Sequence, residues 1–570
     1  MLNQNGLNNQ VKFNRKSIAN NVIEFQQIKK SSESFRKKAE ELNVNLSTAQ
    51  YWCDRVKDIP LPEDMISFFE SSTGIDFLHR LVTALQYVMT EIGSCGIDLV
   101  SLVLKLSNLD YFVASSHGAL QAKGKSLENE IINFAENTQD KLAKNMPYKK
   151  ITIAEDETFH PRICLVAIEA VSNFILLEKY SKSRDANSWN KALDSSLENL
   201  NVDVVQAVSD NAAGLINHIE KHLGANHSTD IFHLLYDISK ATSASMASKV
   251  KSSETKYYEQ KSKSIFNFIL YLLNLNMDNP YVMALILYDF KYQVNLDIKV
   301  ESEKLEKSRN EFNHIKDLQN NIKKHKNKLS TDYHPYDINT GKVITKQDLK
   351  KSINSNIKAI TDVATEGELS DRSLAKIAKV SKASRKMINT MGFYWNNIFK
   401  IANDVCENIT QRHLLIYILI PLYYFKITLN KTSDLNIKIK LKSRISELEF
   451  RLKTNKNWEV VHDNIKITLK KNAKICAELF QRSSSCVEGR NGYLSLRHHG
   501  LHNISDRKLK VLTAIHNYSI KRVDGTTAAN RFFEQEHDDM FEHLLKVMPL
   551  PSRPKISRVI KNKIKLNIAA

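Results

Sequence analysis

The apolar pattern of the chain changes abruptly near residue 149, and this change constrains the fold more than any other feature. Three short runs rich in apolar and β-branched residues follow one another with only a few residues between them. They are ITIAEDETF (151–159), ICLVAIEAV (163–171) and FILLEKYS (174–181). Such closely spaced runs predict three consecutive antiparallel strands, so we expect a mixed α/β domain to begin near residue 149.

Helical and strand-like segments then alternate along the chain. In order, we expect a helix from Asn187 to Leu200, a strand over VDVVQAVS (202–209), a helix from Ala212 to Leu223 and a strand over TDIFHLLYD (229–237). Three meandering strands followed by helix, strand, helix and strand is the order of an RNase H-like fold.

The strand pattern then disappears for over two hundred residues, and long charged helical segments replace it. The most apolar stretch there, Leu414 to Phe425, is shorter than the roughly 20 residues that a bilayer requires. It also contains Pro421, so we expect a buried core segment and no membrane span. With only 15 Gly and 10 Pro in 570 residues, the expected class is α+β and mostly α.

The chain is strongly basic, with 82 Lys and Arg against 63 Asp and Glu and a formal charge of +19. Such a surface attracts polyanions, so nucleic acid is the first partner to expect. The six cysteines form no Cys-x-x-Cys pair, which argues against a disulfide framework and a zinc ribbon. We expect a cytoplasmic protein, because the first residues also lack the apolar core of a signal peptide.

Residues 34–56 have the pattern of a helix-turn-helix. Apolar residues lie on one face of a first helix, in a short turn and on one face of a second helix: Phe35, Ala39 and Leu42, then Val44, then Ala49, Trp52 and Val56. We expect the N-cap of the second helix at the Ser47-Thr48 pair. That leaves Thr48, Gln50, Tyr51 and Arg55 as candidates to contact a DNA groove. An ordinary helical hairpin would have the same pattern.

Two aspartates lie at the predicted strands in a way that suits metal binding. Asp156 lies in the first strand, and Asp210 ends the fourth, at the turn into a helix. These two strands are neighbours in the expected topology, so both carboxylates can face one pair of divalent cations, which require oxygen ligands. Taken singly, Asp210 could be a helix N-cap and Asp156 a strand-edge residue. Glu155 and Glu157 flank Asp156, and Glu157 is the stronger alternative ligand.

Several segments together resemble the bacterial DDE transposases of the RNase H-like superfamily. They are ITIAEDETFHPRICLVAIEA, VQAVSDNAAGL, DIFHLLYDISK and the late segment SSSCVEGRNGYLSLRHHGLHNIS. Asp230 and His233 match the Cys- or Asp-x-x-His signature that some of these enzymes carry after the second aspartate. The late segment resembles the start of the helix that carries the third acid, here Glu488. The 278 residues between Asp210 and Glu488 then require a large helical insertion before the catalytic helix.

The resemblance implies a DNA transposase whose Asp156, Asp210 and Glu488 hold two Mg²⁺ ions, with Mn²⁺ as a substitute. It implies metal-dependent cleavage at transposon ends and strand transfer into double-stranded target DNA, by a homodimer or higher oligomer at the nucleoid. Asp230 and His233 would support the active site, and a zinc site there is the alternative. Arg490, Asn491 and Arg497 would contact DNA, unless they form a solvent-exposed basic helix.

The expected organisation has six parts that follow one another along the chain. They are a helix-turn-helix DNA-binding region (1–60), a helical linker domain (61–148), the first part of the RNase H-like core (149–245), an all-helical insertion domain (246–470), the part of the core with the catalytic Glu helix (471–535) and a basic C-terminal tail (536–570). Two other functions fit the same sequence: a catalytically inactive DNA-binding protein derived from a transposase, and a metal-dependent nuclease on the same fold.

Overall fold

The computed structural model describes residues 14–28, 34–55, 57, 59–159, 161–274, 280–501 and 503–554. Most of these residues are helical, and one mixed five-stranded sheet lies among the helices. The expectation of a mostly α member of the α+β class is therefore confirmed. Val56, residues 555–570 of the predicted C-terminal tail and the first 13 residues lie outside the described residues.

The sheet has the strand order β3-β2-β1-β4-β5. Its strands are β1 (Lys149–Phe159), β2 (Ile163–Glu169), β3 (Ile175–Tyr180), β4 (Val202–Ser209) and β5 (Asn226–Thr229). The first three strands form an antiparallel meander, whereas β4 and β5 run parallel to β1. The connections that make parallel pairing possible are α8 (Ala186–Leu197) and α9 (Ala213–Asn217), which continues as the π-helical turn η3 (His218–His222).

The predicted fifth strand was placed too late in the chain. β5 ends at Thr229, and the run from Ile231 onward is the first turn of a helix. The reason is periodicity: Ile231, Leu234 and Ile238 are buried at helical spacing, and a strand would have buried alternate residues.

Strand β1 is covered on both faces, so apolar residues occur on both sides of it. Ile151 and Ile153 pack into one core with helices α7, α8, α20, α21 and α22. Ala154 faces the opposite side, where it packs with Val487 and Leu494 of helix α19. The sheet thus separates two cores, and α19 covers the second one. These helices are α7 (His117–Lys144), α19 (Ser485–Leu501), α20 (Asp506–Tyr518), α21 (Ala528–Phe533) and α22 (Met540–Val547).

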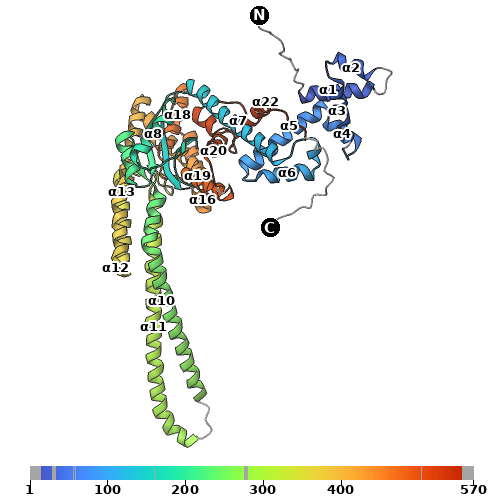
Figure 1. Cartoon of the computed structure of the whole chain (residues 1–570). Helices are drawn as coiled ribbons and strands as arrows, with labels where there is room; N and C mark the ends of the chain where they lie inside the picture. Colours follow the sequence, from blue (N-terminus) through green and yellow to red (C-terminus); the bar gives the residue numbers. More distant parts are fainter. Residues whose placement is uncertain are drawn as a thin grey trace.

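The described residues between β5 and α19 are almost entirely helical. Their helices are α10 (Ile231–Asn274), α11 (Pro280–Asp332), α12 (Lys346–Glu366), α13 (Asp371–Val405), α14 (Ile409–Leu414), η4 (Leu415–Leu419), α15 (Ile420–Lys431), α16 (Leu435–Lys453), α17 (Lys456–Glu459) and α18 (Asp463–Leu479). Helices α10 and α11 form a long hairpin that projects from the body of the molecule (Figure 1). The other helices share one large apolar core with the base of that hairpin, next to the body of the molecule.

One stretch of the described helices, Ile409–Lys431, is long and apolar enough to cross a membrane. More than half of its most apolar window is buried inside the molecule, in the core just described. This burial agrees with the expected core segment. Pro421 does not interrupt the helix as its sequence position suggested, because the wide π-helical turn η4 directly before it accommodates the missing N–H and the bulk of the ring.

Among the described residues of the N-terminal region, the regular secondary structure is helical, with short turns between the helices. It comprises α1 (Arg15–Ile28), α2 (Phe35–Glu41), α3 (Leu46–Asp54), α4 (Glu63–Phe69), α5 (Ser72–Gln86), the π-helical turn η1 (Tyr87–Ile92), α6 (Ile97–Leu106) and the short 3₁₀ turn η2 (Leu109–Tyr111). The first three helices share a small core of Val22, Phe25, Ala39, Val44, Ala49, Trp52 and Cys53. Helices α2 and α3, with a short turn between them, lie where two were predicted.

Candidate active site

Asp156 and Asp210 come together because β1 and β4 are parallel neighbours. Ile153 pairs with Ala207 and Ala154 pairs with Val208. The same register, continued by two residues, sets Asp156 level with Asp210 directly after β4. Their charges interact, since the Asp210 carboxylate is among the groups that raise the pKa of Asp156.

Glu488 reaches the same place from helix α19. Single ligand atoms of Asp156, His233 and Glu488 lie within 4.8 Å of one another, a spacing that could hold a metal ion. Asp210 is outside this closest group, and its Oδ1 atom accepts a hydrogen bond of 2.9 Å from the backbone N–H of Ala212. Three of the predicted site residues are therefore clustered, and the fourth lies at their edge.

The Asp156 carboxylate is partly buried and hydrogen-bonded on both oxygens. Oδ1 accepts from the N–H of Glu157 at 2.9 Å, and Oδ2 accepts from Nδ2 of Asn491 at 2.8 Å. Burial raises the pKa of Asp156 to about 7, and the nearby charge of Glu488 adds to this shift. A carboxyl group with this pKa gains from a bound cation, because a positive charge stabilises its ionised form.

His233 and Glu488 form an ion pair. Nε2 of His233 lies 3.1 Å from Oε1 of Glu488, and both side chains are partly exposed. This hydrogen bond raises the pKa of His233 to about 9 and lowers the pKa of Glu488. His233 is thus protonated at neutral pH in the metal-free protein, and it holds the Glu488 side chain toward Asp156.

Asp230, the first residue of the predicted signature, links two helix starts. Its buried Oδ1 accepts from the N–H of Phe232 at 2.6 Å, in the first turn of α10. Oδ2 accepts from the N–H of Ser484 at 2.8 Å and from the Ser484 hydroxyl, directly before α19. The helix that carries His233 and the helix that carries Glu488 are therefore joined at one carboxylate.

Ser484 was not among the predicted site residues. The sequence did contain a signal for it, because serines directly before a helical segment are frequent N-caps. What could not be anticipated is the partner, a buried aspartate 254 residues earlier in the chain.

Glu155 and Glu157 point to the opposite side of the sheet, so Glu157 is excluded as an alternative to Asp156. Oε1 of Glu155 lies 3.2 Å from Nε2 of His218, and both side chains are fully buried. Oε1 of Glu157 accepts from the indole N–H of Trp189 at 3.3 Å. Side chains alternate along a strand, so both neighbours of Asp156 must face away from Glu488.

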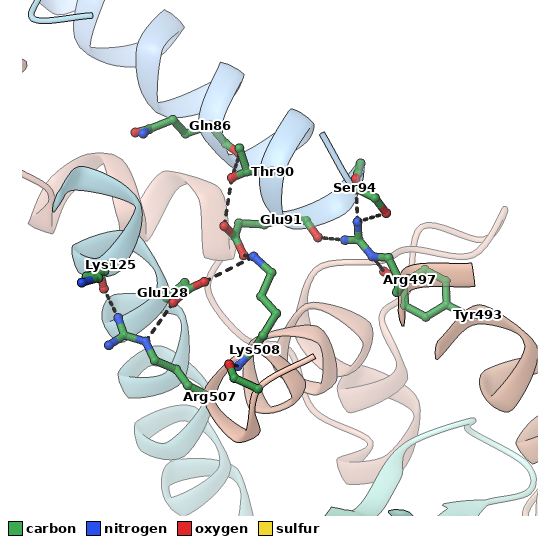
Figure 2. A network of polar contacts seen from close by, with 12 residues as sticks. Gln86, Thr90, Glu91, Ser94, Lys125, Glu128, Tyr493, Arg497, Arg507 and Lys508 are labelled. Carbon is green, nitrogen blue, oxygen red and sulfur yellow. Dashed lines mark hydrogen bonds and ion pairs between the residues drawn. The ribbon is translucent and has the colours of Figure 1, made fainter. Parts of the chain in front are cut away.

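Arg490 and Arg497 were predicted to contact DNA, and their burial contradicts this. Arg490 is 5% exposed and donates two hydrogen bonds, of 2.7 and 2.6 Å, to the carboxylate of Glu178. Arg497 is 2% exposed and bonds to the chain around Glu91 and Ser94 (Figure 2). The alternative of a solvent-exposed basic helix is wrong for both as well. Each is an internal anchor of α19.

Asn491 has a different place from the one expected. It was predicted to contact DNA, but its amide group donates to Asp156 inside the site. Its Oδ1 atom is buried and has no hydrogen-bond partner among the described residues. The wall of the site therefore keeps an unused acceptor.

The candidate DNA-contact residues on and after α3 differ in how exposed they are. Gln50 and Tyr51 are exposed, and Thr48 is partly exposed. Arg55 donates to the backbone oxygen of Pro554 near the other end of the chain. The predicted N-cap is wrong: Asn45 precedes α3, so the Ser47-Thr48 pair lies in the first turn.

The donor set fits a hard divalent cation. Asp156, Glu488 and the adjacent Asp210 supply carboxylate oxygens, and the spare oxygen of Asn491 could accept from a metal-bound water. Mg²⁺ and Mn²⁺ prefer such oxygen ligands, and Mn²⁺ also accepts an imidazole nitrogen. Among the residues that the structure describes, no thiol belongs to this cluster.

Comparisons with known proteins cover one part of the chain. Residues 415–560 match DUF6399, a family of unknown function. The matched range includes the end of the helical region, α19 with Glu488, and the helices that follow. A search of curated proteins finds no match to this chain.

Proposed function

We propose that this protein is a DNA transposase that cleaves DNA at transposon ends and joins it to target DNA with the help of divalent metal ions. The observation that carries the proposal is the convergence of Asp156, His233 and Glu488, which come from a strand and two helices far apart in sequence. The strand order β3-β2-β1-β4-β5 supports an RNase H-like core for this site.

Two Mg²⁺ ions held by Asp156, Asp210 and Glu488 would stabilise the charge that develops on the attacking and leaving oxygens of the phosphodiester. The chain's own residues orient these ligands. Asn491 holds one oxygen of Asp156 by its amide group, and His233 holds Glu488. Asp230 fixes the two helices to each other, so His233 and Glu488 keep their relative position.

The surface beside this cluster suits a nucleic acid. Phe232, Tyr236 and Lys240 follow one another at intervals of four residues on the exposed side of α10, which also carries His233. Phe232 is 53% and Tyr236 61% exposed, and Nζ of Lys240 lies 5.8 Å from the ring centre of Tyr236. Bases stack on exposed aromatic rings, and a lysine beside them attracts phosphate.

The remaining roles follow from this proposal. Helices α2 and α3 would recognise the element ends as a helix-turn-helix, with Gln50 and Tyr51 exposed for contact. The projecting hairpin of α10 and α11 would guide DNA or form the interface of a dimer. We infer a cytoplasmic, nucleoid-associated protein, because the substrate is chromosomal DNA.

The test is a cleavage and joining assay with purified full-length protein, Mg²⁺ and DNA that carries the inverted repeats flanking the gene. Asp156→Asn, Asp210→Asn and Glu488→Gln should each lower the single-turnover rate at least about 100-fold, because each removes charge that holds the metals. Asp194→Asn is the matched control, since Asp194 pairs with His222 on the surface, away from the cluster.

Wild-type rates in any of the three site variants would contradict the proposal. Cleaved products without joined products would identify a nuclease instead. DNA binding without any cleavage by the wild type would identify an inactive DNA-binding relative.

A further inference from the structure

Helix α19 is held by polar contacts at three positions along its length, and the position of Glu488 depends on all three. Before its first turn, Ser484 bonds to Asp230. One turn in, Arg490 pairs with Glu178 of β3. Near its last turn, Arg497 bonds to the chain around η1. The first two anchors belong to the sheet and α10, whereas the third reaches the N-terminal helices.

Arg497 binds the end of the π-helical turn η1 with most of its donors. It donates to the backbone oxygens of Glu91 and Gly93, the latter at 2.5 Å, and to the hydroxyl of Ser94 (Figure 2). Its Nε donates to the hydroxyl of Tyr493 at 3.0 Å. The last carbonyl groups of a helix lack partners within that helix and carry partial negative charge, so a guanidinium is well suited to this end.

The same joint is reinforced by an ionic network. The Glu91 carboxylate is 2% exposed, accepts from Thr90 at 2.9 Å and lies 2.5 Å from Nζ of Lys508 on α20. Lys508 also pairs with Glu128 of α7 at 3.3 Å, and Arg507 pairs with Glu128 at 2.8 Å. Figure 2 shows these contacts meeting between η1, α7, α19 and α20. Glu91 thus binds α20 with its side chain and α19 with its backbone.

A glycine stands on each side of the contact between α19 and the end of η1. A Cβ atom on Gly93 would lie 2.8 Å from the backbone oxygen of Met89, so Gly93 permits the tight end of η1 itself. A Cβ atom on Gly500, at the end of α19, would lie 3.3 Å from Cβ of Ser94. The end of α19 is therefore packed directly against the turn at residues 93–94.

On its other side, η1 continues α5, which carries the N-terminal helices. Helix α1 packs on α5, with Lys16 paired to Asp76 at 2.5 Å. Arg15 donates to the backbone oxygen of Phe112 at 2.7 Å. The helices α1 to α3 thus reach the catalytic helix through η1.

We propose that Arg497 is a positioning residue for Glu488, which it holds in register with Asp156 by docking α19 on the end of the N-terminal helices. This inference rests on the proposed function, because it concerns the same metal site. Arg497 lies nine residues after Glu488 along one helix, about 13 Å along the axis, so it does not touch the reacting groups. It acts through the placement of the helix.

The test measures Mn²⁺ affinity of the full-length protein without DNA, by the electron paramagnetic resonance signal of free Mn²⁺. Glu488→Gln identifies the binding that belongs to the site. Arg497→Lys keeps the charge but loses the fork that spans three acceptors. The matched control is Arg507→Lys, in the same network but on α20, where it contacts α7 and not α19.

We expect Arg497→Lys to weaken Mn²⁺ binding roughly 10- to 100-fold, as for other groups that orient metal ligands. Arg507→Lys should leave it within about twofold of the wild type. Ser94→Ala is a second variant for the case that Arg497→Lys does not fold. It keeps Arg497 and removes one of its acceptors, so it should weaken Mn²⁺ binding roughly two- to tenfold. Thermal melting of each variant measures any general loss of stability separately.

Unchanged Mn²⁺ affinity in Arg497→Lys and Ser94→Ala would overturn the proposal, and so would an equal loss in Arg507→Lys. The result is independent of catalysis. If Arg497→Lys weakens Mn²⁺ binding but the wild type cuts no DNA, the positioning role stands and the proposed function fails. If the wild type cuts DNA and Arg497→Lys binds Mn²⁺ normally, the positioning role fails alone.

Discussion

Nε2 of His233 and Oε1 of Glu488 lie 3.1 Å apart, although 255 residues separate them in the chain. The pair joins the first turn of α10 to the first turn of α19. Because the pKa of His233 is raised to about 9, the imidazolium partly neutralises the two carboxylates beside it. A metal ion that binds at this cluster must compete with this internal cation.

The pH dependence of metal affinity will therefore report the role of His233. Below pH 7 a cation must displace the proton of Asp156, whose pKa is about 7, and this proton alone makes Mn²⁺ affinity rise about tenfold per pH unit up to that point. If His233 is itself a ligand, its proton must also leave, so the rise should be about a hundredfold per pH unit below pH 7 and should continue at about tenfold per unit toward pH 9. If His233 only supports Glu488, the affinity should level off near pH 7. Titration calorimetry with Mn²⁺ between pH 6 and 9 measures this directly.

Asp156→Asn should stabilise the metal-free protein at pH 8. Its folded-state pKa is raised from 3.8 to about 7, so the unfolded chain loses this proton first and the stability falls as pH rises from about 4 to 7. The asparagine removes this cost, which is at most about 4 kcal/mol and smaller for a partly exposed group. Thermal melting at pH 8 with a chelator should show a higher Tm than the wild type. The difference should shrink at pH 4.5, and an equal gain at both pH values would refute the explanation.

Asp230→Ala should cost roughly 2–4 kcal/mol of unfolding free energy. The carboxylate accepts three hydrogen bonds while fully buried, and its loss leaves the N–H groups of Phe232 and Ser484 unsatisfied. Urea unfolding of the full chain measures the change. Asp337→Ala is a suitable control, because Asp337 also accepts from two backbone N–H groups but in an exposed loop, and it should cost less than about 1 kcal/mol.

Phe232→Ala and Tyr236→Ala should each weaken binding of DNA with a single-stranded overhang by roughly 5- to 100-fold, the range for loss of one base–aromatic stack. Fluorescence anisotropy in the presence of a chelator measures binding without cleavage. Phe266→Ala is the matched control: Phe266 lies on the same helix and is 61% exposed, but it is about 45 Å farther along than Tyr236. A similar loss in the control would point to general binding along α10.

The first four strands of the core were predictable from sequence because clear changes of pattern limit them, whereas the fifth was placed too late. The strand predicted over residues 202–209 matches β4 at both ends. The run of β-rich residues begins after Leu200 and Asn201, and Asp210 ends it. The start of α10 was not predicted, because Thr229 to Asp237 is rich in apolar residues and short windows of that kind suit either structure. The buried helical spacing of Leu234 and Ile238 decides it.

The site was predictable only in part. Asp156 lay within a recognisable strand and Asp210 directly after one, so strand order was enough to bring them together. The placement of Arg490 was not, because a buried arginine and a surface arginine look alike in sequence until the partner is known. Its partner, Glu178, is 312 residues earlier and on the edge strand of the sheet.

The large helical region between β5 and α19 also separates the two halves of the site in time. During synthesis Asp156 and Asp210 leave the ribosome at least 278 residues before Glu488. At roughly 5–20 residues per second, that interval lasts about 15–55 seconds. In that interval a nascent chain lacks the acid needed to complete the cluster, and it also lacks the helices α19 to α22 that pack on the two faces of the sheet. Any truncated product that ends before α19 would therefore lack Glu488 and would leave apolar residues on both faces of the sheet without the helices that bury them.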